Sequence, residues 1–274
     1  MIQSGEKTVR RGSDRMLAVE RRNRIIEKLQ EDRRVVVSDL ADVFKVSEET
    51  IRRDLERLDK DGIATKSYGG AVVNEGLSID LDLPFNVRRK RNIPEKQTIA
   101  RLVAEMVSDG DFLMLDASST AVFIAKTLKN TKKDLTIVTN SIEILLELSD
   151  VDGYNVISSG GILKGGYLAL TGPQAIEGLS SFNVEKSFFS CKGIDPKRGI
   201  TEGNSYFAET KRAMMYSARM RVLTVDSSKF NNVGFSRVCD LKELDRIVTD
   251  RKPADTWLEL FDRYRIEAFY PEED

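Results

Sequence analysis

Histidine is absent from this sequence of 274 residues. That absence excludes Ser-His-Asp and Cys-His catalysis, histidine metal ligands and an imidazole pH switch. Only two cysteines, Cys191 and Cys239, are present. So sparse a pair in a chain of this length predicts reduced, structural thiols rather than a disulfide framework. A zinc site would lack ligands, and we expect neither a metal nor a cofactor.

Long apolar runs and an excess of charge are missing as well. No segment approaches the roughly 18 apolar residues that cross a bilayer, and residues 1–16 lack the apolar centre of a secretory signal. We therefore expect a cytoplasmic protein with no membrane span. The 43 basic and 44 acidic residues leave a net charge of −1. Bulk charge thus predicts no nucleic-acid partner, and any case for DNA binding depends on local geometry.

The chain is rich enough in apolar residues, at 41%, to bury a sizeable core, and its length suggests two domains. We expect an α/β protein, in which a small N-terminal winged helix-turn-helix domain precedes an α/β, mainly parallel-sheet domain. The expected segments are a flexible arm (1–15), the small winged helix-turn-helix domain (16–74), a linker (75–94) and the α/β domain (95–274). The basic run at 88–91 is interpreted as a solvated face.

Three short helices are predicted near the amino terminus. A stripe formed by Val19, Ile25, Ile26 and Leu29 marks the first of them. Ser38 is expected to cap a second helix at 39–45, and Ser47 a third that Gly62 ends. The very short join before the third helix is typical of a helix-turn-helix. Residues 63–73 then alternate about a Gly-Gly pair, which predicts a β-hairpin wing.

The third helix carries the candidate DNA contacts, because the start of this helix meets base edges in the major groove. Ile51 and Leu55 are expected to face the core, so that Thr50, Arg53 and Asp54 project on the opposite side. The predicted contacts are Ser47, Glu49, Thr50, Arg52 and Arg53 from the helix, and Lys66, Ser67 and Tyr68 from the wing. The alternative is that Arg52 and Arg53 only pair with Glu48, Glu49 or Glu56 on a solvated face.

Beyond residue 95, short apolar strands alternate with helices, a pattern typical of a parallel sheet. The expected strands are 112–115, 135–138, 154–158, 187–190, 222–225 and 247–248, and the expected helices are 95–107, 120–128, 142–148 and 207–219. Small or polar residues follow four of the strands, where open α/β sheets bind ligands. They indicate a polar, phosphate-bearing ligand, although helix caps and turns would explain each of them separately.

Two sets of motifs resemble the DeoR family of bacterial transcription regulators. The amino-terminal set consists of Arg21, Ile25, Leu29 and the run Ser47-Glu48-Glu49-Thr50-Ile51-Arg52-Arg53-Asp54-Leu55. The wing reads Lys66-Ser67-Tyr68-Gly69-Gly70-Ala71, with Tyr68 where the family usually has histidine. The second set is Asp116-Ala117-Ser118-Ser119-Thr120, Thr139-Asn140, Gly160-Gly161, Gly193-Ile194-Asp195 and Asp226-Ser227-Ser228-Lys229-Phe230, with Ser118 in place of the family's glycine.

The resemblance implies a sensor domain similar to sugar-phosphate isomerases and a set of effector contacts. It assigns Ser118, Ser119 and Thr120 to the phosphate, Asn140 and Gly161 to the sugar, and Lys229 to a further anionic or hydroxyl group. Asp116, Thr139, Gly160 and Lys211 complete the candidate effector site, although Lys211 is interpreted first as a solvated helix lysine.

The function implied is a non-enzymatic regulator, a repressor of carbohydrate catabolism genes controlled by a phosphorylated sugar. Because helix-turn-helix proteins usually read two half-sites by two-fold symmetry, we expect a homo-oligomer, at least a dimer, on a double-stranded operator. The alternative is a sugar-phosphate isomerase with an accessory helical domain. Its acid–base residues would come from Asp116, Glu202, Glu209, Lys211 and Lys229. A structural nucleic-acid-binding protein is disfavoured by the near-neutral charge.

Overall fold

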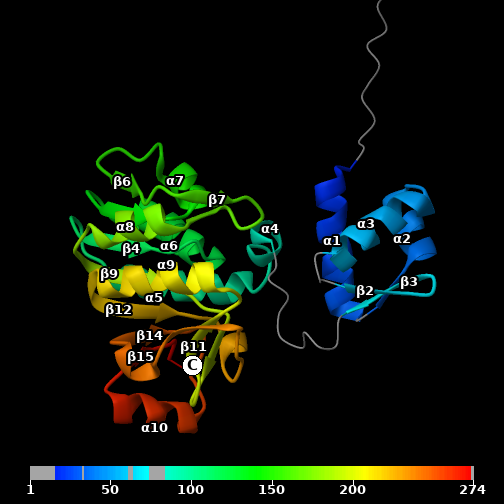
Figure 1. The fold of residues 1–274 in the computed structure, drawn as a ribbon. Helices are drawn as coiled ribbons and strands as arrows, with labels where there is room; N and C mark the ends of the chain where they lie inside the picture. Colours follow the sequence, from blue (N-terminus) through cyan, green and yellow to red (C-terminus); the bar gives the residue numbers. More distant parts are fainter. Residues whose placement is uncertain (1–15, 33, 61–63, 74–83, 273–274) are drawn as a thin grey trace, which may run out of the picture. The chain divides into compact units, whose positions relative to one another are not determined.

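The computed structural model describes residues 16–32, 34–60, 64–73 and 84–272. The predicted arm and the predicted helix end at Gly62 lie outside these residues. The chain divides into two compact units, Met1–Ser78 and Ile79–Asp274 (Figure 1). Within the described ranges, no helix is both long enough and apolar enough to span a lipid bilayer.

The first unit is a winged helix-turn-helix, as predicted. Its elements are the helices α1 (Ala18–Asp32), α2 (Val37–Phe44) and α3 (Glu48–Lys60) and the strands β1 (Arg34–Val36), β2 (Ala64–Ser67) and β3 (Gly70–Val73). The strands form an antiparallel sheet in the order β1-β3-β2. The sequence did not predict β1, which makes the wing three-stranded. Gly70 is required there, because a Cβ atom on it would lie 2.0 Å from the carbonyl oxygen of Val35.

The two predicted helix caps have different outcomes. Ser47 caps α3, since its Oγ accepts a hydrogen bond from the backbone N–H of Thr50 at 3.3 Å. The cap predicted at Ser38 is wrong, because α2 already begins at Val37. Ser38 lies inside the first turn, where its hydroxyl donates instead to the Asp39 carboxylate at 3.1 Å.

The second unit is built on a seven-stranded sheet in which every neighbouring pair is parallel. Its strands, in their order across the sheet, are β15 (Glu267–Phe269), β14 (Arg246–Val248), β12 (Ala218–Thr224), β9 (Val184–Phe189), β4 (Phe112–Leu115), β5 (Thr136–Thr139) and β6 (Asn155–Ser158). The expectation of an α/β fold with a mainly parallel sheet is confirmed.

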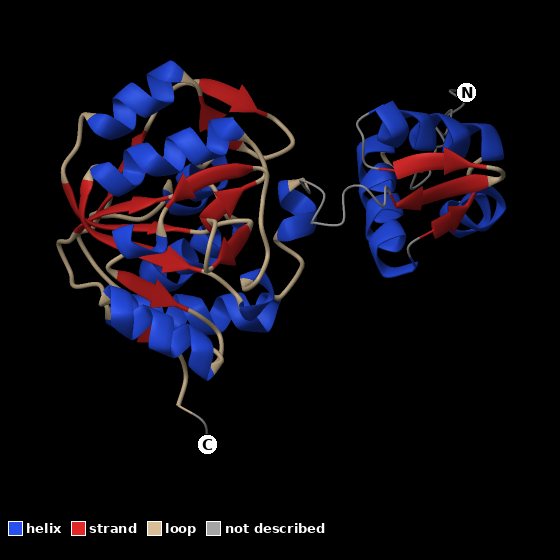
Figure 2. Ribbon diagram, turned by 60° about the horizontal axis from the view of Figure 1, so that its bottom comes forward, coloured by secondary structure: helices blue, strands red, loops and turns tan. Residues whose placement is uncertain are grey.

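Helices cover both faces of this sheet (Figure 2). One face packs against α5 (Ile93–Glu105), α6 (Ser119–Thr131) and α7 (Ile142–Leu148). The other packs against α8 (Pro173–Ser180), α9 (Ser205–Tyr216) and α10 (Asp255–Tyr264). The alternation of strand side chains creates the two cores: Leu113 and Leu115 join the first, and Met114 between them joins the second.

Smaller elements complete the unit, and the sequence did not predict them. They are the hairpin β7 (Ile162–Lys164) and β8 (Ala169–Thr171), the sheet of β10 (Gly193–Asp195), β11 (Gly199–Glu202) and β13 (Ser236–Cys239), and the short helix α4 (Phe85–Arg88). The predicted linker is wrong at its carboxyl end. Phe85 and Val87 are both 1% exposed within the second unit, and α5 begins at Ile93.

Candidate nucleic-acid interface and ligand site

The start of α3 is exposed, and its two arginines are paired within the helix. Arg52 lies 2.6 Å from Glu48, and Arg53 lies 3.3 Å from Glu49. The hydroxyls of Ser47 and Thr50 lie 2.9 Å apart. Exposed pairs one helical turn apart contribute a few tenths of a kcal/mol at most, because water and salt screen them. The arginines are therefore held only loosely and can exchange a carboxylate for a phosphate or a base.

Asp54 does not project from α3 toward solvent as predicted. It is 4% exposed, and its carboxylate lies 2.5 Å from Arg21 and 3.4 Å from Arg22 on α1. The expectation failed because Asp54 stands three residues after Ile51 and therefore shares its buried face. The pair ties α1 to α3 and leaves Asp54 unable to touch DNA.

The wing presents its predicted contacts to solvent. Lys66, Ser67 and Tyr68 are all exposed, and Tyr68 stands at the turn between β2 and β3. Lys66 lies 2.9 Å from Glu56 of α3, and its hydrogen bond lowers the pKa of that carboxyl. The exposed recognition-helix residues and the exposed wing residues thus belong to one compact unit.

In the second unit, the order of the strands marks a topological switch between β4 and β9. From β4 the chain steps outward through β5 and β6, and it then returns to the other side of β4 with β9. Ligands of open α/β sheets bind at the carboxyl ends of the strands at such a point. Asp116 follows β4 directly, and its carboxylate accepts hydrogen bonds from the N–H groups of Ser190, after β9, and Ser118, both at 3.1 Å.

Lys211 of α9 completes a buried ion cluster with this carboxylate. Its ammonium lies 2.5 Å from Asp116 and 3.5 Å from Glu202, and Lys211 itself is 7% exposed. Burial alone would lower the pKa of Lys211, but the two carboxylates outweigh burial and raise it. Lys211 is therefore a charged internal residue, and its interpretation as a solvated lysine is wrong.

The amino terminus of α6 opens next to this cluster. Ser118 caps the helix, because its Oγ accepts from the N–H of Ala121 at 3.0 Å. The N–H groups of Ser119 and Thr120 belong to the first turn, which has no intrahelical acceptors for them. Both residues are largely buried, and within the described part of the chain their hydroxyls make no hydrogen bond. Donors at a helix amino terminus attract an anion.

The end of β5 offers an unused acceptor. Thr139 Oγ1 donates to the carbonyl of Leu115 at 2.6 Å and so joins β5 to β4. Asn140 donates through Nδ2 to the carbonyl of Leu170 in β8 at 3.0 Å. Its Oδ1 is buried and finds no partner among the described residues. A buried carbonyl oxygen without a donor costs free energy, which a ligand hydroxyl would recover.

Gly160 and Gly161 lie at the end of β6, two strand positions from β4. Neighbouring strands are about 4.8 Å apart, which puts that end roughly 10 Å from Asp116. Gly161 has φ +107°, and a Cβ atom on it would lie 2.7 Å from the carbonyl oxygen of Thr171. Packing against β8 thus accounts for Gly161, and any contact with a ligand would come from its backbone.

Lys229 lies in the loop after β12, at the carboxyl end of that strand. The loop forms a single 3-10 turn, η2 (Ser227–Lys229), in which the Asp226 carboxylate accepts from the N–H of Ser228. Burial raises the pKa of the Cys191 thiol, and the charges of Glu202, Lys211 and Lys229 all act on it. These three charges therefore act on one buried thiol, although the residues come from β11, α9 and η2.

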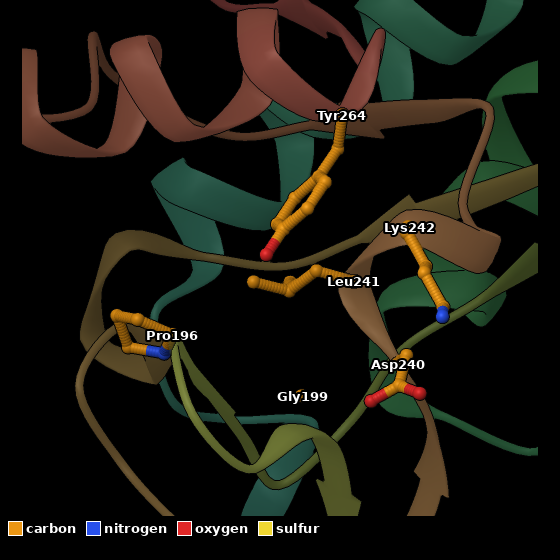
Figure 3. Close-up of a pocket in the computed structure, with 6 residues that line it drawn as sticks. All are labelled: Pro196, Gly199, Asp240, Leu241, Lys242 and Tyr264. Atoms are coloured by element: carbon orange, nitrogen blue, oxygen red, sulfur yellow. The ribbon is translucent and has the colours of Figure 1, made fainter.

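A small pocket elsewhere in the unit shares none of these residues. Figure 3 shows it, with the side chains of Tyr264 and Leu241 pointing toward its middle. It is lined by Pro196, Gly199, Asp240, Leu241, Lys242 and Tyr264. No predicted effector residue lines it.

Among the predicted effector residues, the structure joins Asp116, Ser118 and Lys211 by direct contacts, and their role in binding stays a prediction. The sequence missed Ser190 as a partner of Asp116, and it gave Glu202 only to the alternative enzymatic reading of the site. Polarity directly after a buried strand was the available signal for Ser190, since Asp116 carries the same signal after β4.

Comparison with known proteins covers both units. The model described as "DeoR-like helix-turn-helix domain" matches residues 21–76, and the model described as "DeoR C terminal sensor domain" matches residues 91–251. The transcriptional regulator YulB of Bacillus subtilis is 40% identical over 86% of this chain and 90% of its own. The repressor GlcR of the same organism is 32% identical over 94% of this chain and 98% of its own. The L-fucose operon activator of Escherichia coli is 32% identical over 87% of this chain and 97% of its own.

Solved structures give a weaker likeness. Ribose 5-phosphate isomerase A of Methanocaldococcus jannaschii aligns with a TM-score of 0.36 and 17% identity, covering 49% of this chain and 53% of that one. A likeness at this level carries no functional argument.

Proposed function

This chain belongs to the DeoR family of transcription regulators, and from that premise we propose that it is a repressor whose hold on operator DNA changes when a phosphorylated sugar binds its second unit. The observation that carries the effector half is the group of unused polar atoms at the topological switch. The Oδ1 of Asn140 is buried there without a partner among the described residues. Ser119 and Thr120 are buried residues whose hydroxyls make no hydrogen bond within the described part of the chain.

The phosphate would sit at the amino terminus of α6. The first-turn N–H groups of Ser119 and Thr120 point out of the helix, and their hydroxyls add two more donors. Ser118 is already used as the helix cap, so we assign it the shape of the loop rather than a phosphate contact through its side chain. Lys229 supplies a cation from the opposite loop.

The sugar would lie toward β5, where Asn140 Oδ1 accepts from a hydroxyl. Asp116 and Lys211 hold this wall in place, because each is already satisfied by internal partners. One ammonium between two carboxylates leaves the cluster with a formal charge of −1, so Lys211 offers no free positive charge to a phosphate. We infer that the site binds its ligand without converting it.

At the other end of the chain, α3 would enter the major groove with Thr50, Arg52 and Arg53 toward the bases, and Glu49 and Ser47 beside them. Lys66, Ser67 and Tyr68 would contact the backbone or the adjacent groove. A symmetric pair of half-sites calls for at least a dimer, and operator binding places the protein in the bacterial cytoplasm. Repression is the proposed sign, as in the relative named GlcR.

A pair of threonines on one helix tests the effector site. Thr120→Val removes a hydroxyl at the start of α6 with little change of shape, and Thr127→Val does the same in the middle of α6, where the hydroxyl donates to Phe123. Calorimetry of the full chain would use glucose 6-phosphate, fructose 6-phosphate, ribose 5-phosphate and inorganic phosphate. We expect one sugar phosphate to bind wild type and Thr127→Val alike.

Thr120→Val should bind that sugar phosphate about tenfold or more weakly, because a hydrogen bond to a charged group contributes about 1.5–3 kcal/mol. Equal binding by the two variants would show that the phosphate does not bind at the start of α6. Binding of none of the compounds by wild type would contradict the proposed ligand class.

A further inference from the structure

The segment through which the chain enters the second unit is held by the loops around the ligand site. We call Pro84–Lys96 the entry segment; it contains α4 and the first turn of α5. At its start, the N–H of Phe85 donates to the carbonyl of Gly166, in the turn between β7 and β8, at 2.8 Å. The next residue of that turn is Tyr167, and the guanidinium carbon of Arg88 lies over its ring, 5.9 Å from the ring centre.

The far end of the entry segment is bonded to the loop that carries Lys229. Asn92 Nδ2 donates to Asp226 Oδ1 at 3.1 Å and lies 3.4 Å from Ser228 Oγ. The Asn92 backbone is left-handed, with φ 50° and ψ 46°, a conformation that asparagine and glycine adopt most easily. The same Asp226 oxygen also accepts from the N–H of Ser228, so one carboxylate fixes both the loop and the entry segment.

Two further contacts fix the middle of the entry segment. The buried ammonium of Lys96 donates to the carbonyl of Arg88 at 2.6 Å and to the carbonyl of Arg91, which clamps the turn between α4 and α5. Arg89 lies 3.4 Å from Glu143 in the first turn of α7, three residues after Asn140. The entry segment therefore touches the elements that follow β5, precede β8 and follow β12.

We propose that the entry segment transmits ligand binding to the DNA-binding unit, with the contact between Asn92 and Asp226 as the coupling contact. The inference rests on the proposed function, because it needs a ligand that reaches the loop of Lys229. A ligand that draws this loop inward favours one arrangement of the Asp226 carboxylate. That choice changes how the chain leading to the DNA-binding unit is anchored, and coupling arises only from such a difference between arrangements. Asn92 is thus a positioning residue, which touches neither DNA nor ligand.

The test compares Asn92→Gly with Asn86→Ala in the full chain. Asn92→Gly deletes the side chain and tolerates the left-handed backbone, while Asn86 is exposed on α4 in the same segment. The operator is selected from random duplexes, and its dissociation constant is measured with and without the sugar phosphate that binds wild type. The ratio of the two constants is the coupling factor.

We expect wild type and Asn86→Ala to share a coupling factor of about five or more, within the usual allosteric range. Asn92→Gly should bring the factor close to one, while its separate affinities for operator and for sugar phosphate stay within about threefold of wild type. An unchanged coupling factor in Asn92→Gly would overturn the inference and leave the proposed function intact. Failure of wild type to bind any operator or any sugar phosphate would overturn both.

Hydrogen exchange tests the inference on wild type alone, so a variant that fails to fold cannot affect the result. Adding the sugar phosphate should change the exchange of amides 85–92, starting with the bonded N–H of Phe85, and should leave α10 unchanged as the internal control. Protection at the start of α6 without any change at 85–92 would show ligand binding that bypasses the entry segment, and would overturn the inference.

Discussion

The two units use charged side chains in opposite ways. On α3, Arg53 and Glu49 form a pair in which the side chains are 76% and 62% exposed. In the second unit, Lys211 and Asp116 form a pair in which they are 9% and 2% exposed. The exposed pair stabilises the fold little and can change partners, whereas breaking the buried pair would leave a charge without water or a counterion.

This difference fits the tasks that we propose for the two surfaces. A DNA-binding helix must release its arginines to phosphates and bases, so weak internal partners serve it well. A ligand site must keep its polar walls fixed while the ligand comes and goes, and buried pairs with several hydrogen bonds do so. The first unit also contains a buried pair, Asp54 with Arg21, which joins α3 to α1.

The largest expected effect comes from removing the cation of the buried pair. Lys211→Met leaves the carboxylates of Asp116 and Glu202 without their cation, which should lower the free energy of unfolding by about 3–5 kcal/mol. Urea denaturation at pH 7 measures it. Lys126→Met, in which an exposed lysine 3.6 Å from Glu147 is removed, should change it by about 0.5 kcal/mol or less. Similar losses in the two variants would contradict the contrast.

A second effect depends on pH. Burial lowers the pKa of Lys96 to about 8, whereas an unfolded lysine titrates near 10.5. Between these values the unfolded chain binds a proton that the folded chain has lost, so the contribution of Lys96 to stability rises with pH. Wild type should therefore gain about 2 kcal/mol relative to Lys96→Met between pH 7.5 and 10. Denaturant titrations at both pH values give the difference, and parallel behaviour would mean that Lys96 is not buried as a cation.

For the exposed pair, we expect that removing the arginine changes stability little and weakens DNA binding clearly. Arg53→Ala should leave the free energy of unfolding within about 0.5 kcal/mol of wild type. It should weaken operator binding by about 1–3 kcal/mol, or roughly 5- to 150-fold, as expected for a lost bidentate base contact. Arg24→Ala on α1 is the matched control, since Arg24 is also exposed and 3.5 Å from a glutamate. Equal losses in both variants would move the DNA contact away from α3.

Helical periodicity in the sequence indicates that two charged residues are buried, although their residue type favours the surface. Asp54 stands in a stripe with Ile51, Leu55 and Leu58, all of which are buried. Lys96 stands in the same way before Ile99, Ala100 and Val103 on α5. The periodicity of each stripe predicts burial, but a charged residue type usually indicates the surface. Only the partner, from another element, shows which signal holds.

Many regular elements of the second unit were predictable because their patterns are local, whereas the sequence analysis missed α8, α10 and β15. The helix Ile142–Leu148 and the strand Phe112–Leu115 have the bounds that the sequence predicts. The strands β1, β7 and β10 contain three residues each, too few for alternation to appear. The contacts of Asp116 with Ser190 and Lys211 join residues more than 70 positions apart, and no local pattern contains them.

The most direct measurement of the central claim is fluorescence anisotropy of labelled operator duplex, titrated with the full chain at fixed salt, with and without each sugar phosphate. We predict specific binding at least about a thousandfold tighter than binding to random duplex. One sugar phosphate should weaken it by a factor of about five or more. Operator affinity unchanged by every sugar phosphate, or binding no tighter than to random DNA, would contradict the account of a ligand-controlled repressor.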